Sequence, residues 1–377
     1  MKALRIGQSA AVLSIAALAL TACGGSNTPA ASSSAAGGSS AAGSSAASGA
    51  ALTGTLTGGG ASSQESAMTA WVDGFQQANS GVKVQYNPVG SGAGRKGFLA
   101  GQYQFAGSDS AMKEDEQKEA TKLCGPDGAV QVPAYISPIA VAFNLPGVEH
   151  VNMDADTIAS VFAKKITKWN DPKIAEQNKG VTLPDTAITV VHRSDDSGTT
   201  KNFQDYLSNA APKVWTYGIE EKWPAAISAE NAQGTSGVVK LATETEGSIV
   251  YADASQIGKL GTVAVKVGAD YVQYSPEAAA KTVETSKKVS TNAHDLAIKL
   301  DRTSTEAGTY PIVLVSYHIF CSTYKDQNTV DLIKAFGKYA VSAEGQKVAS
   351  ESAGNAPLSA ATSAEAEKAI DFITVAK

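Results

Sequence analysis

The stretch at residues 192–200 concentrates side chains that bind anions. It reads His-Arg-Ser-Asp-Asp-Ser-Gly-Thr-Thr, which places one guanidinium, two carboxylates and several hydroxyls close together. The guanidinium of Arg193 can present a fixed fork of donors to a tetrahedral oxyanion. Gly198 lets the backbone come close to such an ion. These residue types predict an anion site, with phosphate as the leading candidate.

The elements around this stretch are a short strand and a short helix. Residues 188–191 are mostly β-branched, and Phe203, Tyr206 and Leu207 recur at helical spacing. A turn between a strand and a helix presents free backbone N–H groups and the positive end of a helix dipole, where anions bind. Ser and Asp are also ordinary helix caps, and Arg beside Asp often forms only a surface pair. The stretch alone leaves both interpretations open.

The same arrangement occurs earlier in the chain. A glycine-rich turn at 57–63 follows a strand-like run at 51–56 and precedes apolar residues at helical spacing. A second turn, at 90–94, follows an alternating run at 82–86. Residues 104–109 form a further short candidate strand that ends on an acid. The chain therefore offers several loops that could hold one anion together.

Two alternative interpretations apply to these turns. Ser62 with Glu65 fits a capping box, so its hydroxyl is also a candidate helix cap. Residues 92–97 match G-x-G-x-x-G, which alone is weak support for a dinucleotide site, and the sequence has no G-x-x-x-x-G-K-[ST] loop. We expect no nucleotide and no other cofactor.

The remaining pattern predicts an α/β protein. Strand-like and helix-like runs alternate along the chain, which is the signature of this class. Further strands are expected at 130–143, 247–251, 263–267 and 311–316, and helices at 154–162 and around Leu332, Phe336 and Tyr339. The run 278–288 and the surroundings of Leu296 favour helix weakly. We expect Trp71, Phe75 and Trp169 to pack in the core.

Composition narrows the function classes. The chain has 377 residues, 43% of them hydrophobic, which allows one large domain or two medium ones. A net charge of −5 argues against nucleic acid as a partner. The four histidines show no metal-binding spacing, and no G-x-S-x-G elbow occurs. We expect no metal and no catalysis, and His192 is expected to face away from Arg193.

The N-terminus predicts export and lipid anchoring. Residues 1–22 have a positive start and a short apolar core, as a signal peptide does, and residues 20–23 (Leu-Thr-Ala-Cys) resemble the lipobox of bacterial lipoproteins. Cys23 is then the lipidated residue of a protein held at the extracytoplasmic face of the cell membrane. A secretory signal with an incidental cysteine is the alternative. Residues 23–51 are rich in Ser, Ala and Gly and are expected to form a disordered tether.

Cys124 and Cys321 are the remaining cysteines. In an oxidising compartment they are candidates for a single disulfide. Two buried free thiols are the alternative.

A set of motifs now identifies a family. They read Thr-Gly-Gly-Gly-Ala-Ser at 57–62, Val-Gly-Ser-Gly at 89–92, Phe-Ala-Gly-Ser-Asp at 105–109, Ile-Thr-Lys-Trp-Asn at 166–170 and Arg-Ser-Asp-Asp-Ser-Gly-Thr at 193–199, with support from 139–147 and 310–312. In this order they resemble the phosphate-binding proteins of Pst-type ABC transporters, in the form found in high-GC Gram-positive bacteria. The resemblance covers nearly everything after the tether.

The resemblance implies a fold and a ligand site. The fold is the two-lobed, type II periplasmic-binding-protein fold, with a two-stranded hinge and a ligand cleft. Lobe 1 is expected at 52–138 plus 310–377 and lobe 2 at 139–309, and the partners are inorganic phosphate and membrane-embedded permease subunits. The phosphate ligands carried over are Ser62, Ser63, Ser91, Asp109, Arg193, Ser197, Gly198 and Thr199, with Asp195 supporting Arg193.

The sequence departs from the family at the first loop and raises a question at the acid. The family commonly has Thr, an aromatic residue and Pro where this chain has Ser62-Ser63-Gln64, so Ser63 is expected to contribute its backbone N–H. Asp109 is expected to accept the proton that phosphate still carries. Sulfate lacks that proton, and a buried unmade hydrogen bond costs roughly 1–3 kcal/mol. The alternatives are a phosphatase and a carrier of another oxyanion such as sulfate.

Overall fold

The computed structural model describes residues 51–289 and 293–377. The predicted signal peptide, most of the tether and Cys23 lie outside these residues. The strands are β1 (Gly54–Gly60), β2 (Val82–Asn87), β3 (Phe105–Ser108), β4 (Ala129–Phe143), β5 (His150–Met153), β6 (Thr189–Arg193), β7 (Glu230–Ala232), β8 (Ser248–Asp253), β9 (Gly261–Val267), β10 (Asp270–Val272), β11 (Lys287–Lys288), β12 (Ile298–Lys299), β13 (Val313–Cys321), β14 (Thr323–Tyr324) and β15 (Thr374–Val375).

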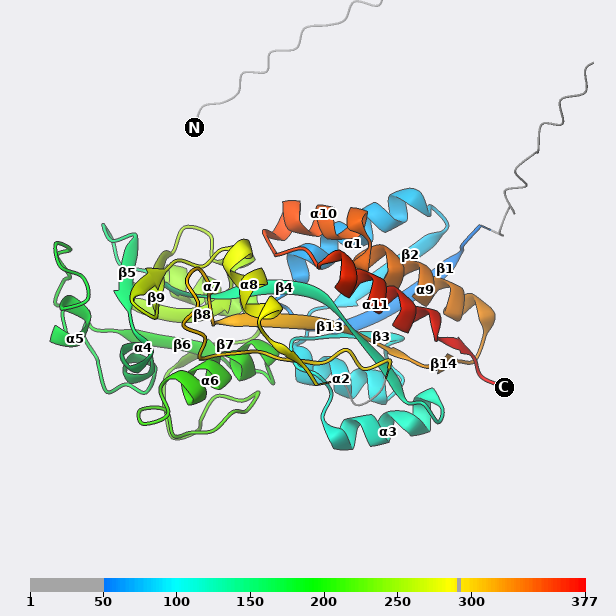
Figure 1. Ribbon diagram of the computed structural model, residues 1–377, viewed down its shortest axis with the longest axis horizontal. Coiled ribbons are helices and arrows are strands. Elements are labelled where there is room, and N and C mark those ends of the chain that lie inside the picture. Colours follow the sequence, from blue (N-terminus) through cyan, green and yellow to red (C-terminus); the bar gives the residue numbers. More distant parts are fainter. Residues whose placement is uncertain (1–50, 290–292) are drawn as a thin grey trace, which may run out of the picture. The chain divides into compact units, whose positions relative to one another are not determined.

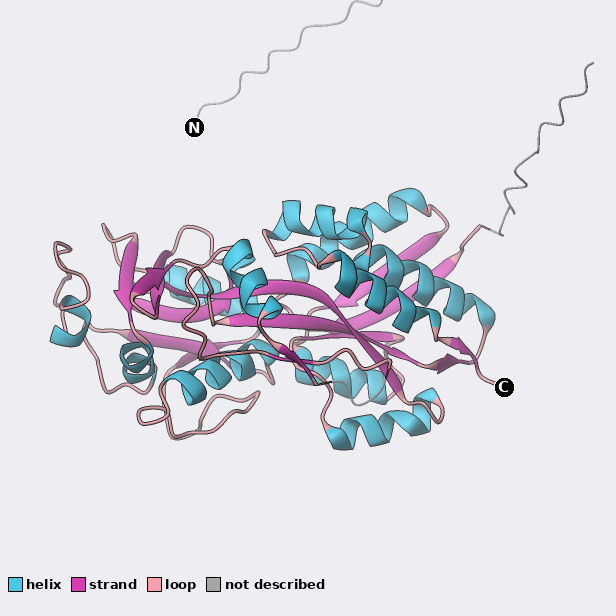
Figure 2. Ribbon diagram, viewed as in Figure 1, coloured by secondary structure: helices cyan, strands magenta, loops and turns pink. Residues whose placement is uncertain are grey.

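Helices follow most of these strands (Figure 2). They are α1 (Glu65–Ala78), α2 (Ser91–Leu99), α3 (Glu114–Cys124), α4 (Ala155–Phe162), α5 (Pro172–Ala175), α6 (Gly198–Ala210), α7 (Gly234–Glu244), α8 (Pro276–Glu284), α9 (Gln327–Val341), α10 (Ala343–Ala353) and α11 (Ala360–Asp371), with a short 3-10 turn at Ala254–Gln256. No helix in the described ranges has the length and apolar character needed to cross a membrane.

The main sheet has two parts that share one strand. Its order is β2-β1-β3-β13-β4-β8-β6-β7, with β9 pairing β4 and carrying β5 and β10. In the first part β1 is parallel to both β2 and β3, and β13 joins β3 to β4 antiparallel. In the second part β6 is parallel to both β7 and β8. The mixed α/β fold agrees with the prediction.

β4 and β13 form the connection between the two parts (Figure 1). The first half of β4 pairs with β13, and from Ile139 onward β4 pairs with β8. Proline cannot donate to a ladder and is found at edges and irregularities. Pro133 lies where the β4–β13 register shifts, and Pro138 lies where β4 changes partner. The two prolines thus stand at the two irregular points of a strand that is buried throughout.

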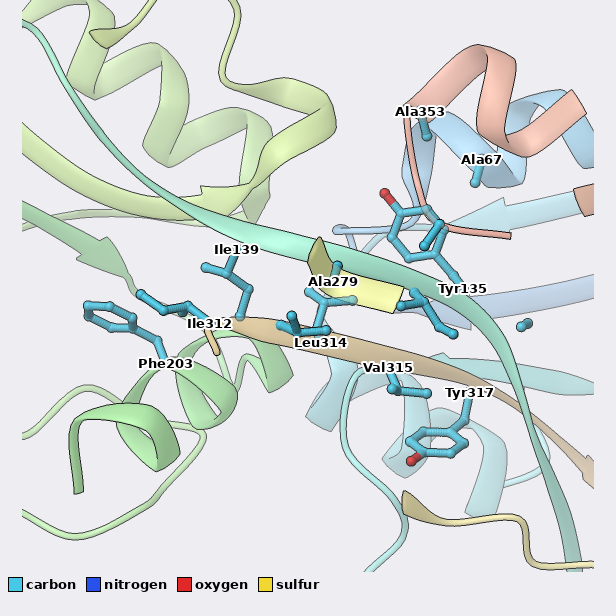
Figure 3. Close-up of a cluster of buried hydrophobic side chains, with 14 of the residues drawn as sticks. Ala67, Tyr135, Ile139, Phe203, Ala279, Ile312, Leu314, Val315, Tyr317 and Ala353 are labelled. Atoms are coloured by element: carbon cyan, nitrogen blue, oxygen red, sulfur yellow. The ribbon is translucent and has the colours of Figure 1, made fainter. Parts of the chain in front are cut away.

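The core lies on both faces of this connection. Helices α1, α9 and α10 lie on one side of the first sheet part and α2 and α3 on the other (Figure 1). Figure 3 shows Tyr135 and Ile139 of β4 beside Leu314, Val315 and Tyr317 of β13 within one buried cluster. The tryptophans expected in the core, Trp71 and Trp169, are fully buried, and Phe75 is 3% exposed.

The structure differs from the sequence prediction at two places. Strand β1 continues through the glycines expected in a turn, and Gly58 and Gly59 pair with both β2 and β3. Glycine is needed at position 58 because a Cβ there would lie 2.3 Å from the ring of Phe105. The helix tendency near Leu296 is wrong, since β12 pairs there with β11. Leu296 donates its backbone N–H to Gln131, a contact far away in sequence that local pattern cannot reveal.

Two further features concern the first sheet part. Cys124, at the end of α3, and Cys321, at the end of β13, form a disulfide across a sequence separation of 197. The segment at 293–299 also lies against this part, since Asp295 accepts a hydrogen bond from Gln131 and His294 stacks on Phe372.

Candidate functional site

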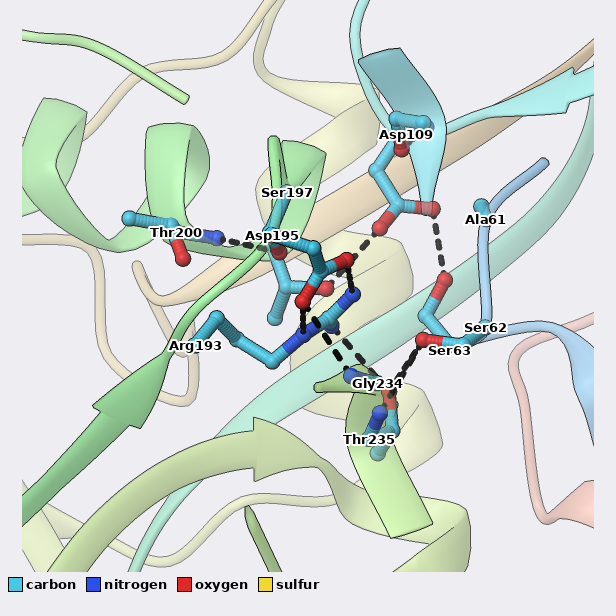
Figure 4. A network of polar contacts seen from close by, with 12 residues as sticks. Ala61, Ser62, Ser63, Asp109, Arg193, Asp195, Ser197, Thr200, Gly234 and Thr235 are labelled. Atoms are coloured by element: carbon cyan, nitrogen blue, oxygen red, sulfur yellow. Dashed lines mark hydrogen bonds and ion pairs between the residues drawn. The ribbon is translucent and has the colours of Figure 1, made fainter. Parts of the chain in front are cut away.

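The topology brings the predicted loops together at strand ends. Strands β1, β2 and β3 are parallel, so the loops that follow them leave the same edge of the sheet. Strands β6, β7 and β8 are parallel to one another in the second part, and α6 and α7 start directly after β6 and β7. Loops from both parts meet in the polar cluster of Figure 4.

Asp109 is the residue that the two sets of loops share. The Ser63 hydroxyl donates to its Oδ1 at 2.6 Å, and the Thr199 hydroxyl donates to its Oδ2 at 2.9 Å. Ser63 belongs to the loop after β1 (Figure 4). Thr199 lies in the first turn of α6. One carboxylate therefore holds hydroxyls from both parts of the sheet.

The surroundings of Asp109 disfavour the ionised form of its carboxyl group. Its side chain is buried, at 4% exposed, and burial raises the pKa of this carboxyl above its usual value. The hydroxyls of Ser63 and Thr199 and the charge of Arg193 oppose that rise. A carboxyl in such surroundings holds a proton more readily than an exposed carboxyl does.

Arg193 is held in one orientation by Asp195. Its Nε donates to Asp195 Oδ1 at 2.7 Å and its Nη2 to Asp195 Oδ2 at 2.5 Å, a bidentate pair that is almost fully buried. Asp195 Oδ1 also accepts the backbone N–H of Gly234 at 3.1 Å. The predicted pairing of Asp195 with Arg193 is present, and the Nε and Nη2 donors of the guanidinium are committed to it. The Nη1 edge of Arg193 points to Thr235, at 3.4 Å from its hydroxyl.

The N-terminus of α6 supplies donors. Ser197 is the N-cap, and its hydroxyl accepts the N–H of Thr200 at 3.1 Å, so the hydroxyl proton stays available to a ligand. The capping interpretation and the ligand interpretation of Ser197 are therefore compatible. Gly198 is required by space, because a Cβ there would lie 2.7 Å from both Asp109 Cβ and Ser91 Oγ.

The other predicted serines occupy neighbouring positions. Ser91 begins α2, and its Oγ accepts the backbone N–H of Asp109 at 3.1 Å. Ser62 does not cap α1: that helix begins at Glu65 after Gln64, with no side-chain cap bond. The capping-box alternative is wrong because the Ser62 hydroxyl instead meets the second sheet part, at 3.1 Å from the hydroxyl of Thr235.

Sequence reasoning missed Thr235. Its backbone N–H donates to Ser62 Oγ at 3.0 Å, and Gly234 has a φ of +72°, which favours glycine. Residues 234–237 read Gly-Thr-Ser-Gly and follow a short strand, the same pattern as Ser-Gly-Thr-Thr at 197–200. That repetition of a glycine and hydroxyls before a helix was the available signal.

His192 lies apart from this cluster. Its ring stacks on Trp223 at 4.9 Å between centroids, and burial lowers its pKa. Residues 51–289 and 293–377 contain no group of three His, Cys, Asp or Glu side chains placed to hold a metal ion. The cluster offers hydroxyls, backbone N–H groups, one guanidinium and one acid, which can surround a tetrahedral oxyanion.

Ion pairs outside the cluster join the same two sets of loops. Arg95 of α2 is 1% exposed and donates from Nε to Glu116 and from Nη2 to Glu221, each at 2.9 Å. Lys96 pairs with Asp196 at 2.8 Å. These contacts fix the middle of α2 against α3, through Glu116, and against the loops before and after α6, through Asp196 and Glu221.

Comparisons of the sequence agree with the geometry. A model of the PBP superfamily domain matches residues 44–344. The phosphate-binding protein PstS 2 of Mycobacterium tuberculosis is 36% identical over 351 residues, covering 90% of this chain and 92% of that protein. PstS 3 of the same organism is 34% identical over 342 residues, with 89% and 90% covered.

Solved structures with the same fold are more distant in sequence. A high-affinity periplasmic phosphate-binding protein bound with phosphate superposes with a TM-score of 0.69 at 21% identity, covering 82% of this chain and 92% of that one. The phosphate-binding protein from Stenotrophomonas maltophilia gives 0.66 at 20% identity, with 84% and 93% covered. These likenesses concern the fold.

Proposed function

Because the chain belongs to the PstS family of phosphate-binding proteins, within the PBP superfamily, we propose that its polar cluster binds one inorganic phosphate. The observation that carries this proposal is Asp109, a buried carboxylate held by hydroxyls from both sheet parts beside a buried guanidinium. An acid in an anion site is useful when the anion itself brings a proton. Hydrogen phosphate does so near neutral pH.

Each predicted ligand receives a role in this proposal. The Arg193 guanidinium supplies the positive charge, and Asp195 keeps its fork oriented. The α6 N-terminus supplies the Gly198 and Thr199 N–H groups together with the Ser197 hydroxyl. The loops after β1 and β2 add donors from Ser62, Ser63 and Ser91, and we add Thr235 as a neighbour of Ser62. Ser63 donates through its hydroxyl to Asp109, so its backbone N–H is the group left for the anion.

Binding and release require the two parts of the molecule to separate. We propose lobes at 52–138 plus 310–377 and at 139–309, with the segment 293–299 as an exception, moving about β4 and the chain that enters β13. The segment 293–299 contacts Gln131 and Phe372, so we propose that it moves with the first lobe. The ion pairs of Arg95 and Lys96 would then break on opening.

We propose delivery to an ABC importer at the membrane. The lipobox-like residues 20–23 support a lipid anchor on Cys23 and an extracytoplasmic location, and the Ser/Ala/Gly-rich tether would give the binding domain reach. The permease subunits would be the protein partners. No nucleic acid is expected, in keeping with a net charge of −5.

The alternatives are less well supported. A phosphatase needs an activated nucleophile with a base. The ring of His192 instead stacks on Trp223, and its Nδ1 is hydrogen-bonded to the carbonyl oxygen of Arg193. In a sulfate carrier the buried carboxylate of Asp109 would face an oxyanion without a proton, and the two negative charges would repel each other. Family membership favours binding without turnover.

Calorimetric titration of phosphate-free, full-length protein tests the proposal. We expect one phosphate per chain and little heat with sulfate. A chromogenic phosphate ester should not be hydrolysed. Turnover of the ester, or equal binding of sulfate, would refute it.

A further inference from the structure

A cavity adjoins Asp109, and neither Ser62 nor Thr235 lines it. It has a volume of about 370 Å³, and it is bounded by the loop that follows β3, by α6, by the segment at 297–302 and by β13. Pockets of a few hundred Å³ are large enough to hold small ligands with water. Asp109 therefore lines this cavity and also belongs to the proposed phosphate cluster.

Asn202 lies between the cavity and the residues of the cluster. Asn202, which lines the cavity, donates from Nδ2 to the Asp109 carbonyl at 2.7 Å and to the Gly198 carbonyl at 2.9 Å. These carbonyls belong to residues of the cluster itself. The side-chain oxygen Oδ1 of Asn202 in turn accepts a hydrogen bond from Arg302 Nη2 at 2.5 Å. Separation of Asp109 from α6 would break the Asn202 bond to Asp109 and leave its bond to Gly198, which lies within α6.

The cavity is positively charged in a negatively charged protein. Lys113, Lys201, Lys299 and Arg302 line it, against Asp109 and Asp205. Arg302 is buried and paired with Asp205 at 2.8 Å, so the charges of these two residues offset each other. The three lysines have no ion-pair partner within the described ranges of the chain.

The charges of two lysines reach the adjoining loops. Burial raises the pKa of Glu221, but Arg95 lowers it, and the charges of Lys201 and Lys113 lower it further, so that the net pKa lies below the usual value. The positive potential of the lysines thus extends to a residue that joins the two sets of loops. An anion approaching this side of the molecule would be attracted by the same positive potential that favours the ionised form of Glu221.

We propose that this cavity, here called the lysine vestibule and defined by Lys113, Lys201 and Lys299, is the route by which small oxyanions reach Asp109. The inference rests on the proposed phosphate function. A chain of net charge −5 does not attract an anion from a distance, so a local cationic mouth is needed to raise the encounter rate. The vestibule acts on association, whereas the cluster around Asp109 and Arg193 governs retention.

Stopped-flow kinetics of phosphate binding to the full-length protein tests the vestibule. The triple variant Lys113→Gln, Lys201→Gln, Lys299→Gln should lower the association rate constant roughly tenfold at low salt, the lower end of the range for steering by a charged cleft. At about 0.01 M salt the screening length is roughly 30 Å, and at about 1 M it is roughly 3 Å, so the difference should nearly vanish at high salt. The dissociation rate constant should stay within about twofold of the unaltered protein.

A matched control separates local from overall charge. Lys83, Lys179 and Lys213 are exposed and do not line the cavity, and their replacement by Gln changes the net charge equally. The control triple should leave the association rate nearly unchanged, and Lys→Arg at the three vestibule positions should preserve it. Equal slowing by both Gln triples would overturn the vestibule. Failure of the unaltered chain to bind phosphate at equilibrium would instead overturn the function on which it rests.

Discussion

Replacing Asp109 by Asn isolates the residue to which we assign selectivity. The side chain keeps its size but exchanges one oxygen for an amide that donates. In the native protein both carboxylate oxygens accept from hydroxyls, of Ser63 at 2.6 Å and Thr199 at 2.9 Å, and no donor is available on this residue for a sulfate oxygen. Asp109→Asn provides such a donor and removes the negative charge.

The magnitude follows from the cost of one buried hydrogen bond. Sulfate leaves the buried carboxylate without the ligand proton that hydrogen phosphate supplies, which costs roughly 1–3 kcal/mol and more for a charged group. Since about 1.4 kcal/mol corresponds to a factor of ten in affinity, we expect the ratio of sulfate to phosphate dissociation constants to fall by roughly ten- to a hundredfold or more. Phosphate affinity should fall as well, because its proton loses a charged acceptor.

Competition calorimetry measures this ratio directly. Phosphate is titrated into protein with and without excess sulfate at a pH where Asp109 is ionised and hydrogen phosphate is present. Burial raises the pKa of Asp109, so acidification protonates it and should lower the native selectivity in the same direction as the substitution.

Asp196→Asn is the matched control. It removes one negative charge near the same helix and breaks the exposed pair with Lys96, but Asp196 is not among the predicted ligands. It should change the affinities for both anions alike. An unchanged sulfate-to-phosphate ratio in Asp109→Asn would refute the assignment of selectivity to Asp109.

Three further predictions concern affinity and stability. Arg193→Lys should weaken phosphate binding roughly ten- to a hundredfold by calorimetry, because an ammonium cannot keep the two bonds to Asp195 and still face the anion. Burial raises the pKa of Asp253 to about 7, so the folded protein keeps a proton that the unfolded chain loses near pH 4. The free energy of unfolding should therefore fall as pH rises from about 4 to 7, by at most about 1.4 kcal/mol per pH unit, and Asp253→Asn should flatten that slope in urea titrations; an unaltered slope would contradict it. Replacing Cys124 and Cys321 by Ser should lower the free energy of unfolding by about 2–4 kcal/mol, measured in urea against the unaltered protein; equal midpoints would show that the disulfide contributes little.

The sequence was informative where the pattern was local and repeated. The strand, turn and helix around Arg193 could be predicted because β-branched residues, a cap and helical spacing follow one another within a short window. The α/β class followed from alternation, and the family from motif order. In each case neighbouring residues contain the relevant information.

The sequence was not informative where a contact joins distant residues. Thr235 meets Ser62 across a sequence separation of 173, and only the parallel order of β6, β7 and β8 explains why its loop arrives there. The short strand β12 depends in the same way on its partner β11. Asp109 was predicted as a ligand from its motif, whereas its two hydroxyl donors became visible only with the fold.

Strand β4 has a thermodynamic consequence. Its residues 129–138 pair with β13 in the first sheet part and residues 139–143 pair with β8 in the second, so each part contains a section of the same continuous strand. If one part unfolds, one section of β4 loses its partner strand. The other section is then continuous with an unfolded segment, which destabilises the part that still contains it. The two parts should therefore melt as one cooperative unit, with a calorimetric enthalpy equal to the van't Hoff enthalpy, although the proposed ligand-binding motion would have them move separately.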